Sequence, residues 1–176
     1  MVLLLALLWA GVTAASAQSV AREYQVKAVF LFNFAQFVEW PATAFPDANV
    51  PLVIGVLWQD PFGSALDETV RGEKIGDRPL VVRRFAHVTE VDQCHILFIS
   101  QSEAAGLDEI LAALKSRSIL TVADAEGFAL RGVMIRFVPE KNHLRLRINL
   151  DAARAAGLSI SSKLLRPAEI VTTHKD

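Results

Sequence analysis

The chain has 176 residues, a formal net charge of −1 and a hydrophobic fraction of 52%. This length fits a single domain, and the balanced charge lacks the basic excess by which nucleic-acid-binding proteins are recognised. Because Cys94 is the only cysteine, no internal disulfide can form, and the fold must be stabilised by its hydrophobic core.

Residues 1–17 have the composition of a secretory signal peptide. An apolar run of about a dozen residues leads to Ala15-Ser16-Ala17, a small-residue cleavage pattern. No Lys or Arg precedes Arg22, so the usual positive region is missing. The run is too short to span ~30 Å of hydrocarbon permanently. We therefore expect a signal peptide over 1–17 and one domain over 18–176, soluble in the periplasm.

The stretch from Lys27 to Pro41 contains four phenylalanines and a tryptophan. Read as a strand, its aromatic residues alternate to one face. Read as a helix, it forms an apolar stripe of Val26, Phe30, Phe34, Phe37 and Val38. The length predicts a helix from about Arg22 to Glu39, because strands average ~5–6 residues, and Pro41 must end it. Few polar residues interrupt the helix, so we expect it to be largely buried.

The middle of the chain alternates apolar strands with short amphipathic helices. The strands are continuous apolar runs, as expected when both faces of a sheet are covered. We predict them at 51–57, 79–85, 94–100 and 119–122. One helix is predicted to begin at an Asp60 N-cap with Pro61 in first position. A second is predicted from a Ser102 cap to about Lys115.

The last third of the chain changes to alternating strands. Val133–Val138, a polar turn and Leu144–Asn149 predict an antiparallel hairpin. A helix over Asp151–Ala156 is predicted to end at Gly157, and a short closing helix to be interrupted near Pro167. The element order predicts an α/β three-layer sandwich with a mostly parallel sheet and an antiparallel hairpin at its C-terminal edge.

Catalytic and metal-binding patterns are not found in the sequence. Cys94 and His95 are adjacent in a strand, so their side chains point to opposite faces, and Cys94 is expected to be a small buried hydrophobe. The histidines have no metal-ligand spacing and the glycines match no nucleotide-binding motif. Asp60 and Asp124 follow strands, where ligands bind in open α/β folds, but turn and capping roles are favoured. We therefore expect no enzyme activity, catalytic residue, cofactor or metal.

The outward face of the predicted hairpin is the strongest candidate for binding. If the apolar residues of the hairpin point to the core, the alternation turns the others away. The predicted partner-binding residues are Met134, Arg136, Arg145 and Arg147. Cations beside exposed apolar surface suit an acidic partner or a phosphorylated small molecule. The alternative is a solvated sheet face without a binding role.

The chain resembles the YfiR-like family of periplasmic proteins over nearly all of its mature sequence. The resemblance rests on E-Y-Q-V-K-A-V-F-L-F-N-F-A-Q-F-V-E-W-P, I-G-V-L-W-Q-D-P-F-G, C-H-I-L-F-I, L-T-V-A-D-A-E-G-F-A and R-L-R-I-N-L-D-A-A-R-A-A-G-L-S-I-S-S-K-L-L. It implies a regulator that binds the periplasmic part of an inner-membrane diguanylate cyclase and holds it inactive, thereby controlling cyclic di-GMP, biofilm and exopolysaccharide. Some relatives carry paired cysteines. Since Cys94 stands alone, control by internal disulfides is not expected here.

Two classes of function remain open. One is a binding regulator of a membrane signalling protein, whose partner would be the periplasmic domain of a diguanylate cyclase or a histidine kinase. The other is a periplasmic receptor for a small molecule, and an exported hydrolase is a third, less favoured class. A homodimer is a further possibility, and no nucleic-acid partner is expected.

Overall fold

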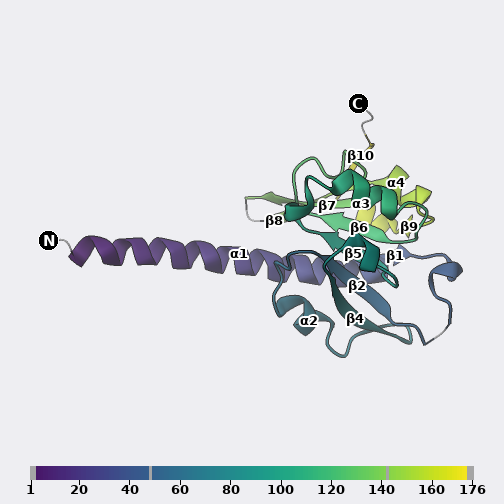
Figure 1. Cartoon of the computed structure of the whole chain (residues 1–176), viewed down its shortest axis with the longest axis horizontal. Helices are drawn as coiled ribbons and strands as arrows, with labels where there is room; N and C mark the ends of the chain where they lie inside the picture. Colours follow the sequence, from purple (N-terminus) through teal and green to yellow (C-terminus); the bar gives the residue numbers. More distant parts are fainter. Residues whose placement is uncertain (1–2, 48, 142, 174–176) are drawn as a thin grey trace.

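The computed structural model describes residues 3–47, 49–141 and 143–173, and its centre is an eight-stranded sheet (Figure 1). The order across this sheet is β10-β8-β7-β6-β5-β2-β4-β3, and only β3–β4 and β7–β8 pair antiparallel. The strands are β2 (Leu52–Leu57), β3 (Lys74–Ile75), β4 (Arg78–Phe85), β5 (Ile96–Ile99), β6 (Leu120–Ala123), β7 (Ile135–Glu140), β8 (His143–Asn149) and β10 (Glu169–Val171). A small antiparallel sheet joins β1 (Val38–Glu39) to β9 (Ser159–Ile160).

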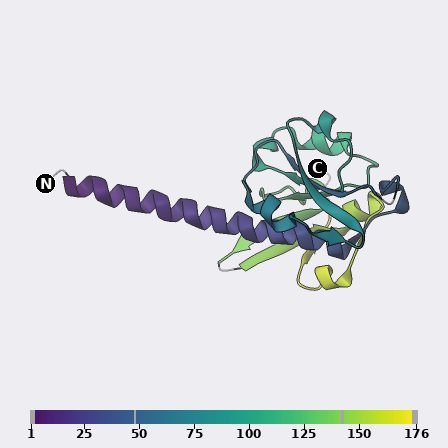
Figure 2. The same cartoon turned by 90° about the horizontal axis from the view of Figure 1, so that it is seen from below.

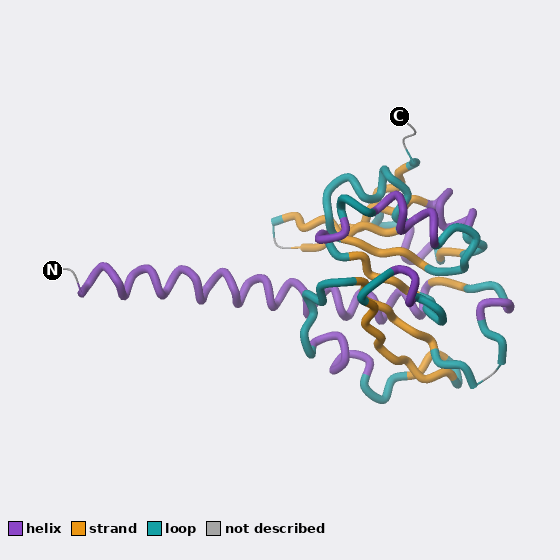
Figure 3. Tube along the Cα trace, viewed as in Figure 1, coloured by secondary structure: helices purple, strands orange, loops and turns teal. Residues whose placement is uncertain are grey.

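Helices cover both faces of the large sheet, which confirms the predicted three-layer sandwich (Figure 3). One face packs against α1 (Leu3–Phe37), α2 (Ala65–Val70), α4 (Leu150–Ala155) and α5 (Ser162–Leu165). The other packs against α3 (Leu107–Ala113) and the segment 125–133. Short 3-10 turns lie at η1 (Ala42–Ala44), η2 (Val88–Glu90) and η3 (Gln101–Glu103).

The structure confirms the four predicted parallel strands and the hairpin, but it corrects two helix starts. Asp60 accepts a hydrogen bond from the Phe62 backbone at 2.8 Å and forms a turn, so α2 begins only at Ala65. Ser102 lies in η3, and α3 begins at Leu107. Strand β10 was not predicted, because its pairing with the distant β8 leaves no local signal. With β8 and β7, it completes the C-terminal edge of the sheet.

Helix α1 ends at Phe37, close to the predicted end, because Val38 and Glu39 pair with β9. The predicted buried stripe is wrong at Val26, which is 48% exposed. The buried face instead contains Lys27, Ala28, Leu31, Phe34 and Ala35. The observed buried face is shifted by about one residue along the sequence from the predicted stripe, which corresponds to a rotation around the helix axis. The helix therefore has one buried face and one open face, rather than being buried all round.

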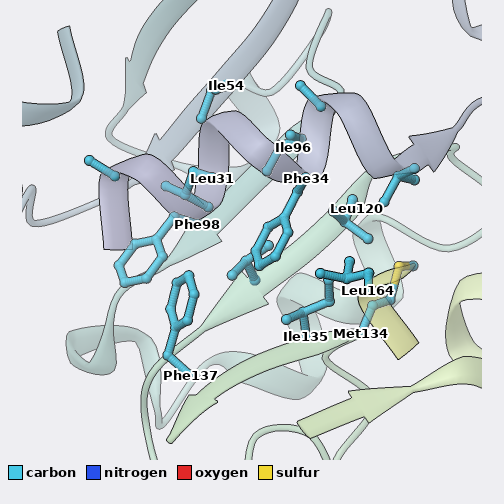
Figure 4. Packing of buried hydrophobic residues seen from close by; sticks show 14 of the residues in the cluster. Leu31, Phe34, Ile54, Ile96, Phe98, Leu120, Met134, Ile135, Phe137 and Leu164 are labelled. Carbon is cyan, nitrogen blue, oxygen red and sulfur yellow. The ribbon is translucent and has the colours of Figure 1, made fainter. Parts of the chain in front are cut away.

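The core beneath α1 is built largely from aromatic and branched residues (Figure 4). The Phe34 ring stacks on the Phe137 ring of β7 with centroids 5.8 Å apart. Phe98 of β5 and Leu31 of α1 are fully buried in the same cluster. These contacts fix α1 across the sheet and so determine which of its residues reach the carboxyl ends of the strands.

Strand β2 is the point at which the order of the parallel strands reverses. It pairs in parallel with both β4 and β5, and the chain passes from β2 to β4 on one side and later from β5 to β6 on the other. Ligands of open α/β sheets bind outside the carboxyl ends of strands at such a point. The residues that follow the two strands at this point are Trp58 after β2 and Ser100 after β5, and Asp124 follows the next strand, β6.

Candidate functional site

In the two hairpin strands, successive side chains alternate between the two faces of the sheet, as expected from the sequence. This alternation begins at Ile135. In the register of β7 and β8, Arg136 is opposite Arg147, and Val138 is opposite Arg145. Directly opposite residues of an antiparallel pair share one face of the sheet. The three arginines therefore lie on the same face, as predicted.

The exposure predicted for this face holds for the two arginines of β8 but is wrong for Met134 and Arg136. Arg145 has 56% of its side chain exposed and Arg147 has 37%. Met134 and Arg136 are each only 8% exposed. Met134 precedes β7, where the alternation has not yet begun, and it packs in the core near Leu164 (Figure 4).

Arg136 is on the interior strand β7, which pairs with β6 and β8. Its Nε atom has no hydrogen-bond partner among the described residues. Burial lowers the pKa of Arg136, and the neighbouring Arg147 guanidinium lowers it further. Glu126 and Asp124 oppose this effect. Arg136 is thus a costly group to bury, because its guanidinium is shielded from water without a full set of partners.

Both exposed arginines are held by carboxylates of the same sheet edge. Arg145 Nε lies 2.9 Å from Glu140 Oε2. Arg147 Nε donates to Glu169 Oε2 of β10 at 2.8 Å. Such exposed pairs contribute little to stability, about 0–1 kcal/mol each. The guanidinium groups of both arginines remain accessible to other carboxylates. A carboxylate of a partner protein could therefore replace Glu140 or Glu169 in these ion pairs.

A groove that the sequence analysis missed lies between α1 and the tip of the hairpin. Its volume is 640 Å³. The residues that line it are Gln18, Ser19, Arg22, Glu23 and Val26 of α1 and Pro139, Lys141, His143 and Leu144 of the hairpin. Figures 1 and 2 show the hairpin tip and α1 projecting on the same side of the domain. The groove was missed because Val26 had been assigned to the buried stripe of the helix.

A buried charge network connects α1 to the carboxyl end of β6. Lys27 is 2% exposed, and its Nζ lies 2.6 Å from both Asp124 Oδ2 and Glu23 Oε1. Tyr24 donates its hydroxyl to Asp124 Oδ2 at 2.9 Å. Burial, and then the charge of Asp124, raise the pKa of Tyr24 well above its usual value of 10.0. The predicted turn role of Asp124 is therefore incomplete, since this carboxylate anchors the helix.

Trp58, at the carboxyl end of β2, combines a strained backbone with an exposed ring. Its φ is +68°, a left-handed conformation that is rare for a bulky residue. Its N–H donates to the Phe85 carbonyl at 2.8 Å, and its ring lies 5.7 Å from that of His87. The residue is 46% exposed. Such strain persists only where the surrounding structure imposes it, and it is frequent at functional positions.

The backbone strain at Trp58 can be measured with a matched pair of variants. We expect Trp58→Gly to be more stable than Trp58→Ala by about 1 kcal/mol, because only glycine adopts a positive φ without a Cβ penalty. Both variants remove the ring, so their difference in free energy of unfolding reports the backbone alone. Urea denaturation measures it, and an alanine variant as stable as the glycine variant would disprove the strain.

The Cys94 and His95 side chains have separate structural roles at the opposite end of the sheet. Burial raises the pKa of the Cys94 thiol to about 12, as expected for a buried hydrophobe without nucleophilic character. A Cβ on Gly55 of β2 would lie 2.8 Å from Cys94 Sγ, so the two residues pack as a complementary pair. His95 accepts from the Val53 N–H at Nδ1, 3.0 Å away, and its Nε2 lies 3.2 Å from the Ala44 carbonyl.

Within the described residues, no group of three or more histidine, cysteine, aspartate or glutamate side chains is placed to hold a metal ion. None of the helices, over the part of the chain that the structure describes, is long and apolar enough to cross a membrane. The arrangement of these residues thus offers surfaces for binding, of which the hairpin edge, the neighbouring groove and Trp58 are the most accessible.

Comparison with known proteins gives a family and a similar fold among solved structures. A family model described as YfiR/HmsC-like matches residues 24–169. The structure is similar to the crystal structure of a conserved domain protein from Vibrio cholerae O1 biovar eltor strain N16961, with a TM-score of 0.51 and 13% sequence identity. That similarity covers 67% of this chain and 54% of the other, and at this identity it concerns the fold alone. Proteins with curated functions give no match.

Proposed function

Because the chain belongs to the YfiR/HmsC-like family, we propose that it is a non-enzymatic periplasmic regulator of an inner-membrane signalling protein. The partner is the periplasmic domain of a diguanylate cyclase, which the bound regulator keeps inactive, so that cyclic di-GMP and biofilm formation stay low. Residues 1–17 are removed as a signal peptide, and residues 18–176 form the exported domain. Mass spectrometry of the exported protein would show a chain that begins at Gln18.

The observation that supports a binding role most directly is the pair of arginines on strand β8 of the hairpin. Arg145 is exposed and Arg147 partly exposed, and both lie on one face. Among the described residues, surface carboxylates that a partner can displace hold them. An acidic partner domain can replace those carboxylates without unfolding the hairpin. Charges of this kind at the rim of an interface act mainly on the association rate and on its salt dependence. Met134 and Arg136 support the surface from behind rather than contacting the partner directly, since both are buried.

The double variant Arg145→Glu/Arg147→Glu tests the hairpin surface. We expect it to bind the purified periplasmic domain of the partner cyclase roughly tenfold more weakly at low salt, with a smaller difference at high salt. Titration calorimetry at two salt concentrations measures the affinity, and the melting temperature shows whether the variant is folded.

The matched control for this test is Lys115→Glu/Lys163→Glu, which makes the same change of net charge at exposed positions away from the hairpin. A folded hairpin variant that binds as tightly as the control would remove Arg145 and Arg147 from the interface. Absence of binding by the wild-type protein, together with unchanged cellular cyclic di-GMP after deletion of its gene, would contradict the regulatory role itself.

A second function, a receptor for an anionic small molecule, is favoured by Arg136. Its Nε is buried without a hydrogen-bond partner in the described part of the chain, and the opposite strand presents a second guanidinium, Arg147. A ligand carboxylate or phosphate would supply the missing acceptor. A thermal-shift screen of such compounds against wild type and Arg136→Met distinguishes this function, because only a receptor would show a shift that the variant loses.

A further inference from the structure

The groove between α1 and the hairpin tip has an apolar floor contributed by both elements. Val26 of α1 is 48% exposed, and it faces Pro139 and Leu144 of the hairpin across the groove. Val29, one turn further along α1, is also 48% exposed. On a helix, residues three and four apart lie on one face, so Arg22, Val26 and Val29 form a continuous line. The open face of α1 thus begins with a cation and continues with two valines.

The rim of the groove carries cations from both walls. Arg22 on α1 and Lys141 at the hairpin tip are exposed and line the groove. Neither side chain forms an ion pair with any residue that the structure describes. Their charges are therefore available to a ligand, and two cations at a groove mouth attract negative charge more strongly than either does alone.

The carboxylates near the groove offset only part of this positive charge. Glu23 Oε1 lies 2.6 Å from Nζ of the buried Lys27. Glu140 Oε2 is 2.9 Å from Arg145 Nε and 3.3 Å from His143 Nε2. Lys27 Nζ also lies 2.6 Å from Asp124 Oδ2, so its single charge is shared by two carboxylates and Glu23 is cancelled only in part. The two cations Arg22 and Lys141 outweigh this remaining negative charge, so the rim is positive overall.

We propose that this groove binds an acidic segment of the partner protein that presents an apolar face, as an amphipathic helix does. The inference rests on the proposed function, since it names the part of the partner that the regulator recognises. The apolar face covers Val26, Pro139 and Leu144, while the acidic residues at its border pair with Arg22 and Lys141. This is the helix-in-groove mode of recognition, in which apolar anchors supply affinity and border charges supply orientation.

The positive charge of the groove favours an acidic segment over a second copy of the chain, a basic segment or an uncharged apolar segment. A second copy of the chain, docked about a two-fold axis, would bring Arg22 and Lys141 against the same two residues of its neighbour. Like charges meeting in an interface are unfavourable by several kcal/mol. A basic segment is repelled for the same reason. An uncharged apolar segment would leave both cations without counter-charges as it displaced their water.

The test uses a synthetic amphipathic peptide of leucine and glutamate, labelled with a fluorophore, and the exported protein. Controls are a peptide of the same composition in scrambled order and one with lysine in place of glutamate. We expect only the first to bind, and Arg22→Glu/Lys141→Glu to weaken it roughly tenfold or more, an effect that salt reduces. Val26→Asp is expected to abolish the binding while leaving the melting temperature close to that of the wild type, since Val26 is on the open face of α1.

The possible results test the groove inference and the proposed regulatory function independently of each other. Equal binding of the scrambled peptide, no binding of the amphipathic one, or a concentration-dependent dimer that protects Val26 from hydrogen exchange would overturn the groove inference. If the cyclase domain binds wild type and Arg22→Glu/Lys141→Glu equally well, the regulatory function stands and the groove inference is overturned. If the peptide binds in the groove but the cyclase domain does not bind, the groove inference stands and the choice of partner is wrong.

Discussion

Replacement of Asp124 by alanine is expected to lower the free energy of unfolding by about 3 kcal/mol, the lower end of the range for breaking a buried ion pair. Asp124 is the acceptor for both Lys27 Nζ at 2.6 Å and the Tyr24 hydroxyl at 2.9 Å. Its loss leaves a 2%-exposed ammonium group with Glu23 as its remaining carboxylate partner among the described residues. Because Glu23 is 40% exposed, water screens that pair and it compensates only in part.

A double variant separates the ion pair from the packing around it. Lys27→Met removes the buried charge while keeping a similar side-chain volume, so Lys27→Met/Asp124→Ala is expected to be more stable than Asp124→Ala. Asp92→Ala is the matched control, because the Asp92 carboxylate is exposed and pairs only at the surface with Arg83. We expect no measurable change in the control. Urea denaturation of Asp124→Ala, Lys27→Met and the double variant measures the coupling, and a double variant destabilised by the sum of the two single changes would disprove it.

The network also explains why α1 is important for the candidate site. Lys27 and Tyr24 hold the helix to the end of β6, and the open face that starts at Arg22 follows from that attachment. If the network is broken, α1 loses its fixed position beside the hairpin and the groove changes shape. Asp124→Ala is therefore expected to impair peptide binding as well as stability, although Asp124 does not line the groove.

The sequence predicted the layers of the fold because strand and helix periodicities are local properties. The apolar runs of β2 and β5 are fully buried, as a parallel sheet covered on both faces requires. Strands β9 and β10 were not predicted, since each is short and pairs with a segment distant in sequence. Pairing of that kind depends on the tertiary structure, which leaves little trace in the residues of the strand itself.

The candidate site was predicted only in part, for a related physical reason. Alternation along the hairpin placed Arg136 and Arg145 on the same face, and the register confirms this. The alternation of side chains does not show which parts of a sheet face are covered by other segments. Arg136 is therefore buried although Arg145, on the same face, is exposed. Lys27 offers a signal that the sequence analysis did not use, because a lysine within a largely buried aromatic helix needs a buried partner.

The second large loss of stability is expected when His95 is replaced, because its ring holds the loop after β1 against the sheet. The Val53 N–H donates to Nδ1, so the hydrogen of the neutral ring is on Nε2 and is donated to the Ala44 carbonyl. The Phe45 ring stacks on the imidazole at a centroid distance of 4.4 Å. His95→Ala would leave the Val53 amide unsatisfied and open a cavity, and we expect a loss of roughly 2–4 kcal/mol.

The same geometry makes the stability of the protein depend on pH. Burial, and to a smaller extent the charge of Arg78, lower the pKa of His95 below its usual value of 6.5. Below pH 6.5 the unfolded chain binds a proton at this residue that the folded chain does not. Stability contributed by neutral His95 is thus fully present above the unfolded pKa and is lost as the pH falls toward the folded pKa, by up to about 1.4 kcal/mol per pH unit.

Two substitutions isolate this contribution of His95. Glutamine can accept from the Val53 N–H and donate to the Ala44 carbonyl without titrating, so the free energy of unfolding of His95→Gln is expected to vary less between pH 7.5 and pH 5 than that of the wild type. His143→Gln is the control for the loss of one imidazole, because His143 is 59% exposed at the hairpin tip. Chemical denaturation across this pH range measures the slopes. An unchanged slope in His95→Gln would assign the acid sensitivity to other groups, whereas a reduced one would assign it to protonation of His95.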